Sequence, residues 1–459
     1  MEPLALTLLI AVLGWGWIRL NHLWYKDRLS PFNLLLFAWV GPLALRAYNL
    51  SDQERAWPLE VVLILVWVTA ALALPVLALR PPKDSAMASE ARRVFGRTLG
   101  VFRTPLFLWL IIGLYAFSFA AYIYNEFVTN PVGIALLTFL RDPTIPLGDY
   151  HRWGKEEGRS IGLYFSLPVQ VLVPMLYLGF RANAGRARRW VLLALALAYP
   201  IMAALKLSRS DILYSGISML FVEYYYRRFT RSETERRFGR WRALRYAVLV
   251  SLVGVALNAF LIIRAGFTPG EGGAATLIGL KVQAGLLSSP IGEVYGYFAM
   301  PFENFSNIFQ RYTGGLELGV GPLRPVFSLT GQSDAAERLM GRLNLESVLL
   351  YPINTYTFLT MTYVELGLVG IVLVPLLYSA GMATLYRWFL RRPTLPAMFI
   401  YLTFVPCWMW LFVTNGFSVL SFYLNAGVIV MLFVGYRILV LVARWWPASA
   451  GAVAGEKAW

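Results

Sequence analysis

Runs of apolar residues recur along the chain, each about as long as a membrane-crossing helix. Such a helix needs about 20 mostly apolar residues, because the hydrocarbon core of a bilayer is about 30 Å thick. The pattern predicts an all-α protein, a polytopic transmembrane helix bundle of about eleven spans in a single multi-pass domain over 1–459. The predicted runs are 3–20, 32–48, 58–79, 104–125, 161–180, 190–206, 210–226, 246–263, 359–386, 397–413 and 421–443.

Loops that are rich in lysine and arginine alternate with loops that contain few of them. The loops after the first, third, fifth, seventh and ninth runs, together with the C-terminal segment, hold 27 of the 41 basic residues. Short loops rich in Lys and Arg stay in the cytoplasm. We therefore expect the C-terminus inside the cell and the N-terminus outside.

Two longer segments, 126–160 and 265–358, remain on the outer side. The second is the larger and contains a stripe of aromatic residues whose spacing places them on one face of a helix. We expect this helix to lie on the membrane or to pack on the mouth of the bundle, with Pro301 as a candidate kink and 313–331 as a mobile connector. The stripe consists of Tyr295, Phe298, Phe302, Phe305 and Phe309.

Composition supports the membrane interpretation and excludes several others. Hydrophobic residues make up 58% of the chain and charged residues 14%, against about 25% charged in soluble proteins. One cysteine, Cys407, and two histidines exclude a disulfide framework and predict no metal site. The net charge of +16 can suit nucleic acid, but the basic residues lie in short loops between apolar runs. We therefore expect anionic membrane lipid as a partner, and no nucleic acid.

The chemistry is expected at the outer ends of the helices. The chain has no phosphate loop, no GxGxxG motif and no HExxH motif, so we expect no nucleotide-driven reaction and no cofactor. Arg209 lies in the tight outer turn between two runs, and Arg264 closes the run at 246–263. Such arginines can simply extend to the lipid headgroups. Two of them beside the largest loop favour a ligand, and guanidinium forms forked bonds to phosphate, as a diphosphate-linked lipid would present.

Five short motifs in 200–380 resemble the O-antigen polymerases of the Wzy type. Together they follow the order and sidedness of that family, although the glycine expected eleven positions after each arginine is replaced by Leu220 and Ala275. The related O-antigen ligases share the first motif. The five are Ser208-Arg-Ser-Asp-Ile-Leu213, Arg264-Ala-Gly266, the stretch from Tyr297 to Asn304, Asn354-Thr-Tyr-Thr357, and Tyr363 to Gly370.

The resemblance implies a metal-independent glycosyltransferase of GT-C-like architecture at the periplasmic face of the bacterial cytoplasmic (inner) membrane. Such an enzyme moves a glycan from its undecaprenyl diphosphate carrier onto a new lipid-linked repeat unit during lipopolysaccharide synthesis. Its expected partners are the undecaprenyl-diphosphate-linked oligosaccharides and a Wzz-type chain-length co-polymerase. The N-terminus is then periplasmic.

Roles can be assigned as hypotheses. Arg209, Arg264 and Arg311 are the candidates for binding diphosphate, where they would stabilise the charge of the leaving group. Tyr297 and Asn304, together with Asn354 in a later motif, are the candidates for binding sugar hydroxyls.

Glycosyl transfer also needs a base for the acceptor hydroxyl. His151 is the one histidine of the outer segments, and Glu303 and Asp211 are its acidic rivals. Asp211 has a second interpretation as the ion-pair partner of Arg209. We expect Glu365 to be structural, and the aromatic stripe to serve packing rather than sugar stacking.

Two other functions remain open. An O-antigen ligase would transfer the glycan to a lipid A core, and the sequence does not separate it from a polymerase. A lipid-linked oligosaccharide flippase belongs to another class, and transporters often have inverted repeats and broken helices at the membrane midplane. The chain has no evident repeat, and its charges gather at the outer mouth.

Overall fold

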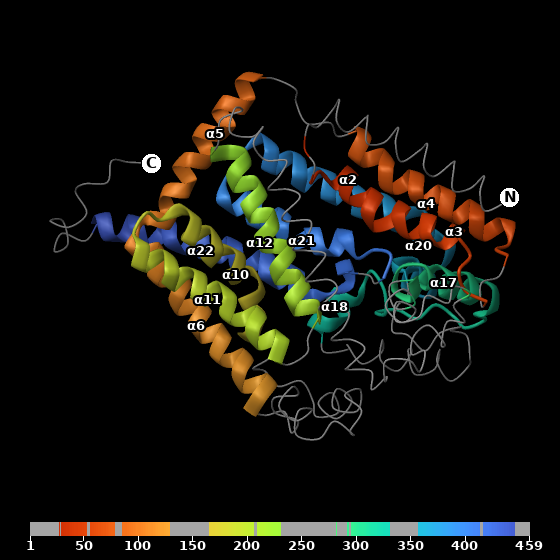
Figure 1. Ribbon diagram of the computed structural model, residues 1–459. Coiled ribbons are helices and arrows are strands. Elements are labelled where there is room, and N and C mark those ends of the chain that lie inside the picture. Colours follow the sequence, from red (N-terminus) through yellow and green to blue (C-terminus); the bar gives the residue numbers. More distant parts are fainter. Residues whose placement is uncertain are drawn as a thin grey trace.

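The computed structural model describes residues 27, 29–52, 56–78, 85–128, 165–205, 209–230, 281, 292, 295–330, 357–413 and 416–445. Every regular element in these ranges is a helix (Figure 1). The helices are α2 (Pro31–Leu35), a π-helical stretch (Leu36–Val40), α3 (Gly41–Ala47), α4 (Leu59–Ala78), α5 (Ser85–Leu99), α6 (Pro105–Ile123), α10 (Val169–Ala182), α11 (Arg186–Leu205), α12 (Arg209–Thr230), α17 (Met300–Arg311), α18 (Arg324–Leu329), α20 (Phe358–Arg391), α21 (Leu395–Met409) and α22 (Leu420–Trp445). Short 3₁₀ and π segments join some of them, at Gly100–Arg103, Tyr124–Val128 and Gly416–Ser418.

Nine of the eleven predicted runs coincide with helices, and the runs 3–20 and 246–263 lie outside the described residues. Five helices are long and apolar enough to cross a membrane, namely α4, α6, α11, α20 and α22. The stretch Pro31–Arg46, α10 and α21 are apolar but shorter. The apolar helices thus support a membrane protein, while a count of eleven spans stays a prediction.

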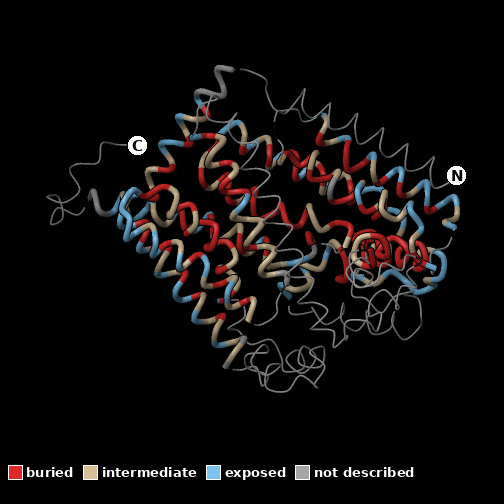
Figure 2. Tube along the Cα trace, in the orientation of Figure 1, coloured by how far each residue is buried: buried red, intermediate tan, exposed pale blue. Residues whose placement is uncertain are grey.

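The interior of the bundle is built around α10 and α21. Both are apolar around most of their circumference, which is the pattern of a fully surrounded helix. α10 packs against α6, α11 and α12, and α21 packs against α20 and α22. Figure 2 shows the buried residues running along these central helices, with exposed residues on the outer flanks.

The outer flanks are themselves apolar. On α4, α6 and α22 the side chains of Val66, Trp109 and Met431 are 62%, 71% and 67% exposed. Large exposed apolar surfaces are rare in water-soluble monomers and mark contact with lipid or partners. This surface fits helices that face the hydrocarbon of a bilayer.

α12 departs from the prediction of a plain span. It is a helix of 22 residues, but it is not among the five long apolar helices. Its ends carry Asp211, Glu223, Arg227 and Arg228, which lower its hydropathy. These charged side chains have hydrogen-bond or ion-pair partners within the bundle, so α12 makes polar contacts with the surrounding helices.

α5 was not predicted, because the loop it occupies was interpreted as plain basic surface. The helix is amphipathic. Ala91, Phe95 and Leu99 are buried, and the Phe95 ring stacks on Phe229 of α12 at 5.0 Å. Its arginines Arg93 and Arg97 are exposed.

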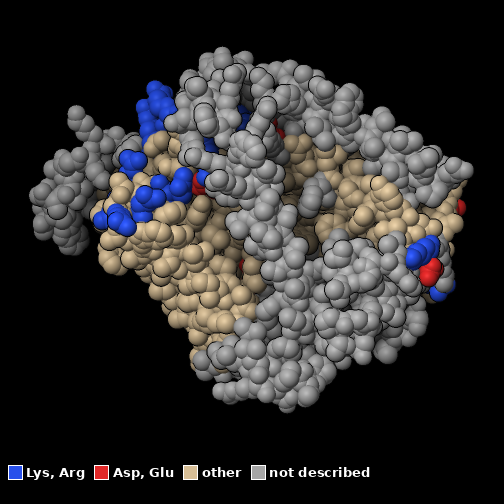
Figure 3. Space-filling view, viewed as in Figure 1, with Lys and Arg blue, Asp and Glu red and all other residues tan. Residues whose placement is uncertain are grey.

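Basic side chains gather at one end of the bundle, which we call the basic end. It comprises α5, the connection between α10 and α11, and the C-terminal turn of α12, and Figure 3 shows most of the visible Lys and Arg there. Contacts between these elements hold the end together. Arg103 donates to the carbonyl of Ala182 at 3.2 Å, and Asn183 donates to the carbonyl of Phe102 at 3.0 Å. The clustering agrees with the loop assignment made from charge, although the sidedness itself stays a prediction.

Candidate functional site

The helix predicted in the large loop exists as α17, and it is packed into the bundle. Residues 300–308 are all buried. The aromatic stripe packs on other helices, with ring-centroid distances of 5.1 Å for Trp39–Phe302 and Phe309–Tyr363, and 4.6 Å for Phe298–Phe412. The expectation that the stripe serves packing is confirmed. Pro301 does not kink the helix, because it lies in the first turn, where proline is tolerated.

Glu303 is the centre of a small polar group on α17. Its side chain is 2% exposed and forms an ion pair with Arg46 of α3, and it accepts a hydrogen bond of 2.7 Å from the indole N–H of Trp57. The Arg46 guanidinium also lies 4.7 Å from the centroid of the Trp57 ring. Breaking a buried ion pair leaves an uncompensated charge, which costs several kcal/mol. The group therefore fastens the loop helix to the bundle.

The other predicted residues of α17 and its approach differ in exposure. Asn304 is fully buried, and Tyr297 is half-buried. Arg311 is exposed at the C-terminal end of the helix. Arg311 alone among these three is thus freely open to a ligand from outside.

Arg209 is the first residue of α12, and Asp211 lies in the first turn of that helix. The Gln170 amide donates to Asp211 Oδ1 at 3.3 Å, and Ser215 donates to the Asp211 carbonyl at 2.7 Å. The Arg209 side chain lies outside the described residues. An arginine at the start of a helix adds its charge to the positive end of the helix dipole, which attracts anions.

The start of α12 and α17 lie at the same end of the bundle, which we call the loop end. Tyr214 of α12 contacts Trp410 at a ring distance of 6.4 Å, and Trp410 stacks on Phe412 at 6.1 Å. Phe412 in turn contacts Phe298, just before α17. In Figure 1, α12 begins at its end away from α5. Asp211 of α12 and the α17 residues Glu303 and Arg311 thus lie on elements that this chain of ring contacts joins, away from the basic end.

Glu365 is structural, as predicted. Its carboxylate accepts backbone N–H bonds from Gly319 at 2.5 Å and Leu323 at 2.9 Å. Two bonds of this kind tie the connector after α17 to α20, so this part of the connector is anchored rather than mobile. α20 is broken nearby, because Gly367 has φ 61 and ψ −149, a region open mainly to glycine. The Glu317 N–H donates to the Val364 carbonyl at 3.0 Å, so a backbone carbonyl close to the break has a hydrogen-bond partner from outside the helix.

Three of the predicted site residues, His151, Arg264 and Asn354, lie outside the described residues. Their positions relative to Asp211 and Glu303 stay predictions. Within the described part of the chain, no three His, Cys, Asp or Glu side chains gather to hold a metal ion.

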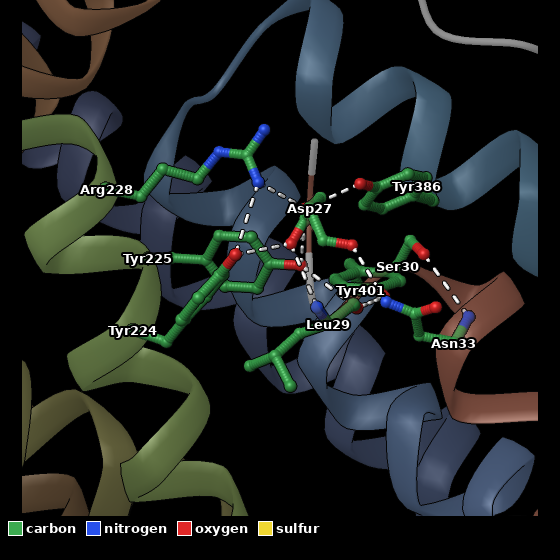
Figure 4. Close-up of polar contacts among 9 residues, drawn as sticks. All are labelled: Asp27, Leu29, Ser30, Asn33, Tyr224, Tyr225, Arg228, Tyr386 and Tyr401. Carbon is green, nitrogen blue, oxygen red and sulfur yellow. Dashed lines mark hydrogen bonds and ion pairs between the residues drawn. The ribbon is translucent and has the colours of Figure 1, made fainter. Parts of the chain in front are cut away.

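Sequence reasoning missed a cluster at the basic end (Figure 4). Asp27, with a side chain 0% exposed, forms an ion pair of 2.8 Å with Arg228. Burial alone would lower the pKa of Arg228, but the Asp27 carboxylate raises it above its ordinary value. The hydroxyls of Tyr224 and Tyr386 donate to the same carboxylate at 2.8 and 2.5 Å.

Further contacts extend the cluster across the bundle. The Tyr225 hydroxyl lies 3.4 Å from Asp27 Oδ2, and the Leu29 N–H donates to Oδ1 at 3.0 Å. Tyr401 of α21 donates to the Leu29 carbonyl at 3.3 Å. One carboxylate thus joins the segment before α2 to α12 and α20, and Leu29 extends the link to α21.

Different signals were available for the missed residues. Arg46 lies near the predicted outer end of an apolar run, as Arg209 and Arg264 do. The same reasoning about arginines at outer helix ends therefore also selects Arg46. Asp27 is an acid between Lys26 and Arg28 in a basic loop, and nothing in the local pattern indicates that it is buried. Trp57 resembles any interfacial tryptophan.

No family profile matches the chain, and no curated protein or solved structure matches it either.

Proposed function

We propose that the protein is an oligosaccharide repeat-unit polymerase, a glycosyltransferase that extends surface polysaccharide on undecaprenyl diphosphate at the outer face of the bacterial cytoplasmic membrane. The observation that carries the proposal is the loop end. There α17 packs into an apolar bundle, and a chain of aromatic ring contacts joins it to the helix that begins with Arg209 and Asp211. The order of the sequence motifs supports the same function.

The proposed reaction uses a substrate that is already activated. The acceptor sugar hydroxyl attacks the anomeric carbon of the growing glycan, and a new C–O bond forms. The bond from that carbon to the diphosphate oxygen breaks, and its electron pair leaves with undecaprenyl diphosphate. The acceptor proton passes to a base. No nucleotide is consumed.

Arg209 and Arg264 are proposed to bind the diphosphate, with Arg311 as a third cation. Charge-assisted, forked bonds from guanidinium would stabilise the leaving group as its charge develops. His151 and Asp211 stay the proposed candidates for the base. Glu303 stays a third, but its ion pair with Arg46 and its bond from Trp57 give it a separate task in positioning α17.

The test uses purified protein in nanodiscs with lipid-linked repeat units as the only substrate. We expect a ladder of extended chains, and we expect Arg209→Ala to abolish it while the protein stays folded. Arg209→Lys should restore part of the activity, because Lys keeps the charge but lacks the planar fork. Arg97→Ala, which removes an exposed arginine of the basic end, is the matched control and should leave the ladder unchanged.

Three outcomes would contradict the proposal. Full activity of Arg209→Ala would eliminate diphosphate binding by this residue. If wild-type protein makes no ladder but transfers the glycan once a lipid A core acceptor is added, the protein is a ligase. Movement of lipid-linked units across the membrane without any new glycosidic bond would indicate a flippase.

A further inference from the structure

A small cavity, partly open to its surroundings, lies between α10, α12, α21 and α22. Its volume is about 30 Å³. The walls are mostly apolar, from residues such as Val171, Phe399 and Phe422, and five side chains with polar atoms interrupt them. These are Gln170, Tyr214, Ser218, Thr403 and Asn425. None of the described residues that line the cavity is charged, so their chemistry is that of neutral hydrogen bonding.

Asn425 places an unsatisfied hydrogen-bond acceptor at this cavity. The residue is 2% exposed on the apolar helix α22, and its Oδ1 accepts no hydrogen bond from any residue that the structure describes. Buried side-chain polar atoms in native proteins are nearly always bonded to protein or to ordered water. Burying an amide carbonyl without a donor is costly. The cavity therefore needs a hydrogen-bond donor at this atom.

Two donors in the lining are already engaged. Thr403 Oγ1 donates to the Phe399 carbonyl in its own helix at 2.9 Å. Gln170 Nε2 donates to Asp211 Oδ1 at 3.3 Å. The hydroxyls of Ser218 and Tyr214 also line the cavity, but neither reaches Asn425 Oδ1, which has no hydrogen-bond partner among the described residues. A small ligand that accepts from such a hydroxyl and donates to Asn425 Oδ1 would bridge the two groups.

We propose that this cavity is a water-binding site anchored by Asn425 Oδ1. A buried water needs about 10–15 Å³ of such volume and two to four polar partners, and the cavity meets both conditions. A sugar ring is too large for it, and an ion would find no opposite charge. Water bound here joins α22 to α12 through Ser218, and reaches α10 through Gln170, which holds Asp211.

The inference does not depend on the proposed function, because it rests on the cavity and on one buried carbonyl. It assigns Gln170 a position between the water and Asp211. The start of α12 is then connected to the bundle interior by a hydrated contact in addition to the direct packing of Tyr214.

The test is hydroxyl-radical footprinting by X-ray radiolysis of the full-length protein in nanodiscs. Radicals form from bound water in place and modify the side chains beside it. Phe422 lines the cavity and is 6% exposed, while Phe433 lies on the same helix, is 9% exposed and lines no part of the cavity. We expect Phe422 to be modified several-fold faster than Phe433. Equal slow modification of both rings would overturn the proposal.

A variant sharpens the result. Asn425→Leu keeps the size of the side chain and removes the carbonyl, so the excess modification of Phe422 should disappear. Ser118→Ala is the matched control, because Ser118 is 1% exposed on α6, also has an unbonded hydroxyl, and does not line the cavity. It should leave the rate at Phe422 unchanged. Persistent fast modification in folded Asn425→Leu would remove Asn425 as the anchor, and if this variant fails to fold, the wild-type comparison of the two rings decides.

Discussion

The basic end and the loop end each contain a buried carboxylate, and the two are satisfied differently. Asp27, at the basic end, receives an arginine, three tyrosine hydroxyls and a backbone N–H (Figure 4). Glu303, at the loop end, is held by the guanidinium of Arg46 and the indole of Trp57. The described contacts of Asp27 come from its own segment and from two long helices, whereas those of Glu303 come from one short helix and the segment after it.

The difference indicates different structural roles for the two ends of the bundle. Many shared donors make a rigid junction, because no single loss leaves the carboxylate bare. The described contacts of Glu303 tie it to a short helix and the segment after it, and such a contact opens at lower cost than one between long helices; binding sites are drawn from less stable regions. A loop end that must admit a bulky lipid-linked substrate fits the second arrangement.

The largest expected effect is the loss of Asp27. Asp27→Ala leaves Arg228 and several hydroxyls without their partner and should cost about 3–5 kcal/mol of unfolding free energy. Thermal unfolding of detergent-solubilised protein measures it as a clear fall in Tm. Glu60→Gln, at an exposed carboxylate in the first turn of α4, is the control and should hardly change Tm. An Asp27→Ala variant as stable as wild type would show that Asp27 does not form a rigid junction.

An intermediate effect is expected for Glu303→Gln. Glutamine keeps an acceptor for Trp57 but loses the ion pair with Arg46, which should cost about 1.5–3 kcal/mol, the range for hydrogen bonds to charged groups. The same unfolding assay tests this value, and chain extension should fall because α17 is less well held. If Glu303→Gln lowers the free energy of unfolding more than Asp27→Ala does, the carboxylate at the loop end contributes more stability than the one at the basic end, contrary to the comparison.

The smallest effect is expected for Tyr386→Phe. The variant removes a single hydroxyl from Asp27 while Arg228 and two other tyrosines remain, so the loss should be about 0.5–1.5 kcal/mol. Tyr225→Phe serves as its pair, because that hydroxyl lies 3.4 Å from Asp27 rather than 2.5 Å and should matter less. Equal, large losses in both would show that the donors are not redundant.

The sequence predicts the helices well because hydropathy is a local property. Runs such as 58–79 and 104–125 coincide with α4 and α6 within a few residues. α5 was missed because a helix of 15 residues with many arginines does not stand out from a basic loop. The partnership of Arg46 with Glu303 spans 257 positions, and no local pattern encodes such a pairing.

For the candidate site, the sequence predicts residue types better than contacts. Glu365 was recognised as structural because a carboxylate within an apolar helix requires partners, although the backbone amides that serve it lie more than 40 positions away. The burial of Glu303 was not foreseen, because helical periodicity places it off the aromatic stripe. Burial around the whole circumference of α17 depends on what surrounds it.

The break at Gly367 also sets how much of α20 can lie within a bilayer. A straight helix of its 34 residues would be about 51 Å long, well beyond the hydrocarbon thickness of about 30 Å. The part after the break, 368–391, measures about 36 Å and is sufficient to cross by itself. If that part spans the bilayer, the first turns of α20 lie outside the hydrocarbon, and Glu365, which accepts hydrogen bonds from backbone amides, does not have to cross it.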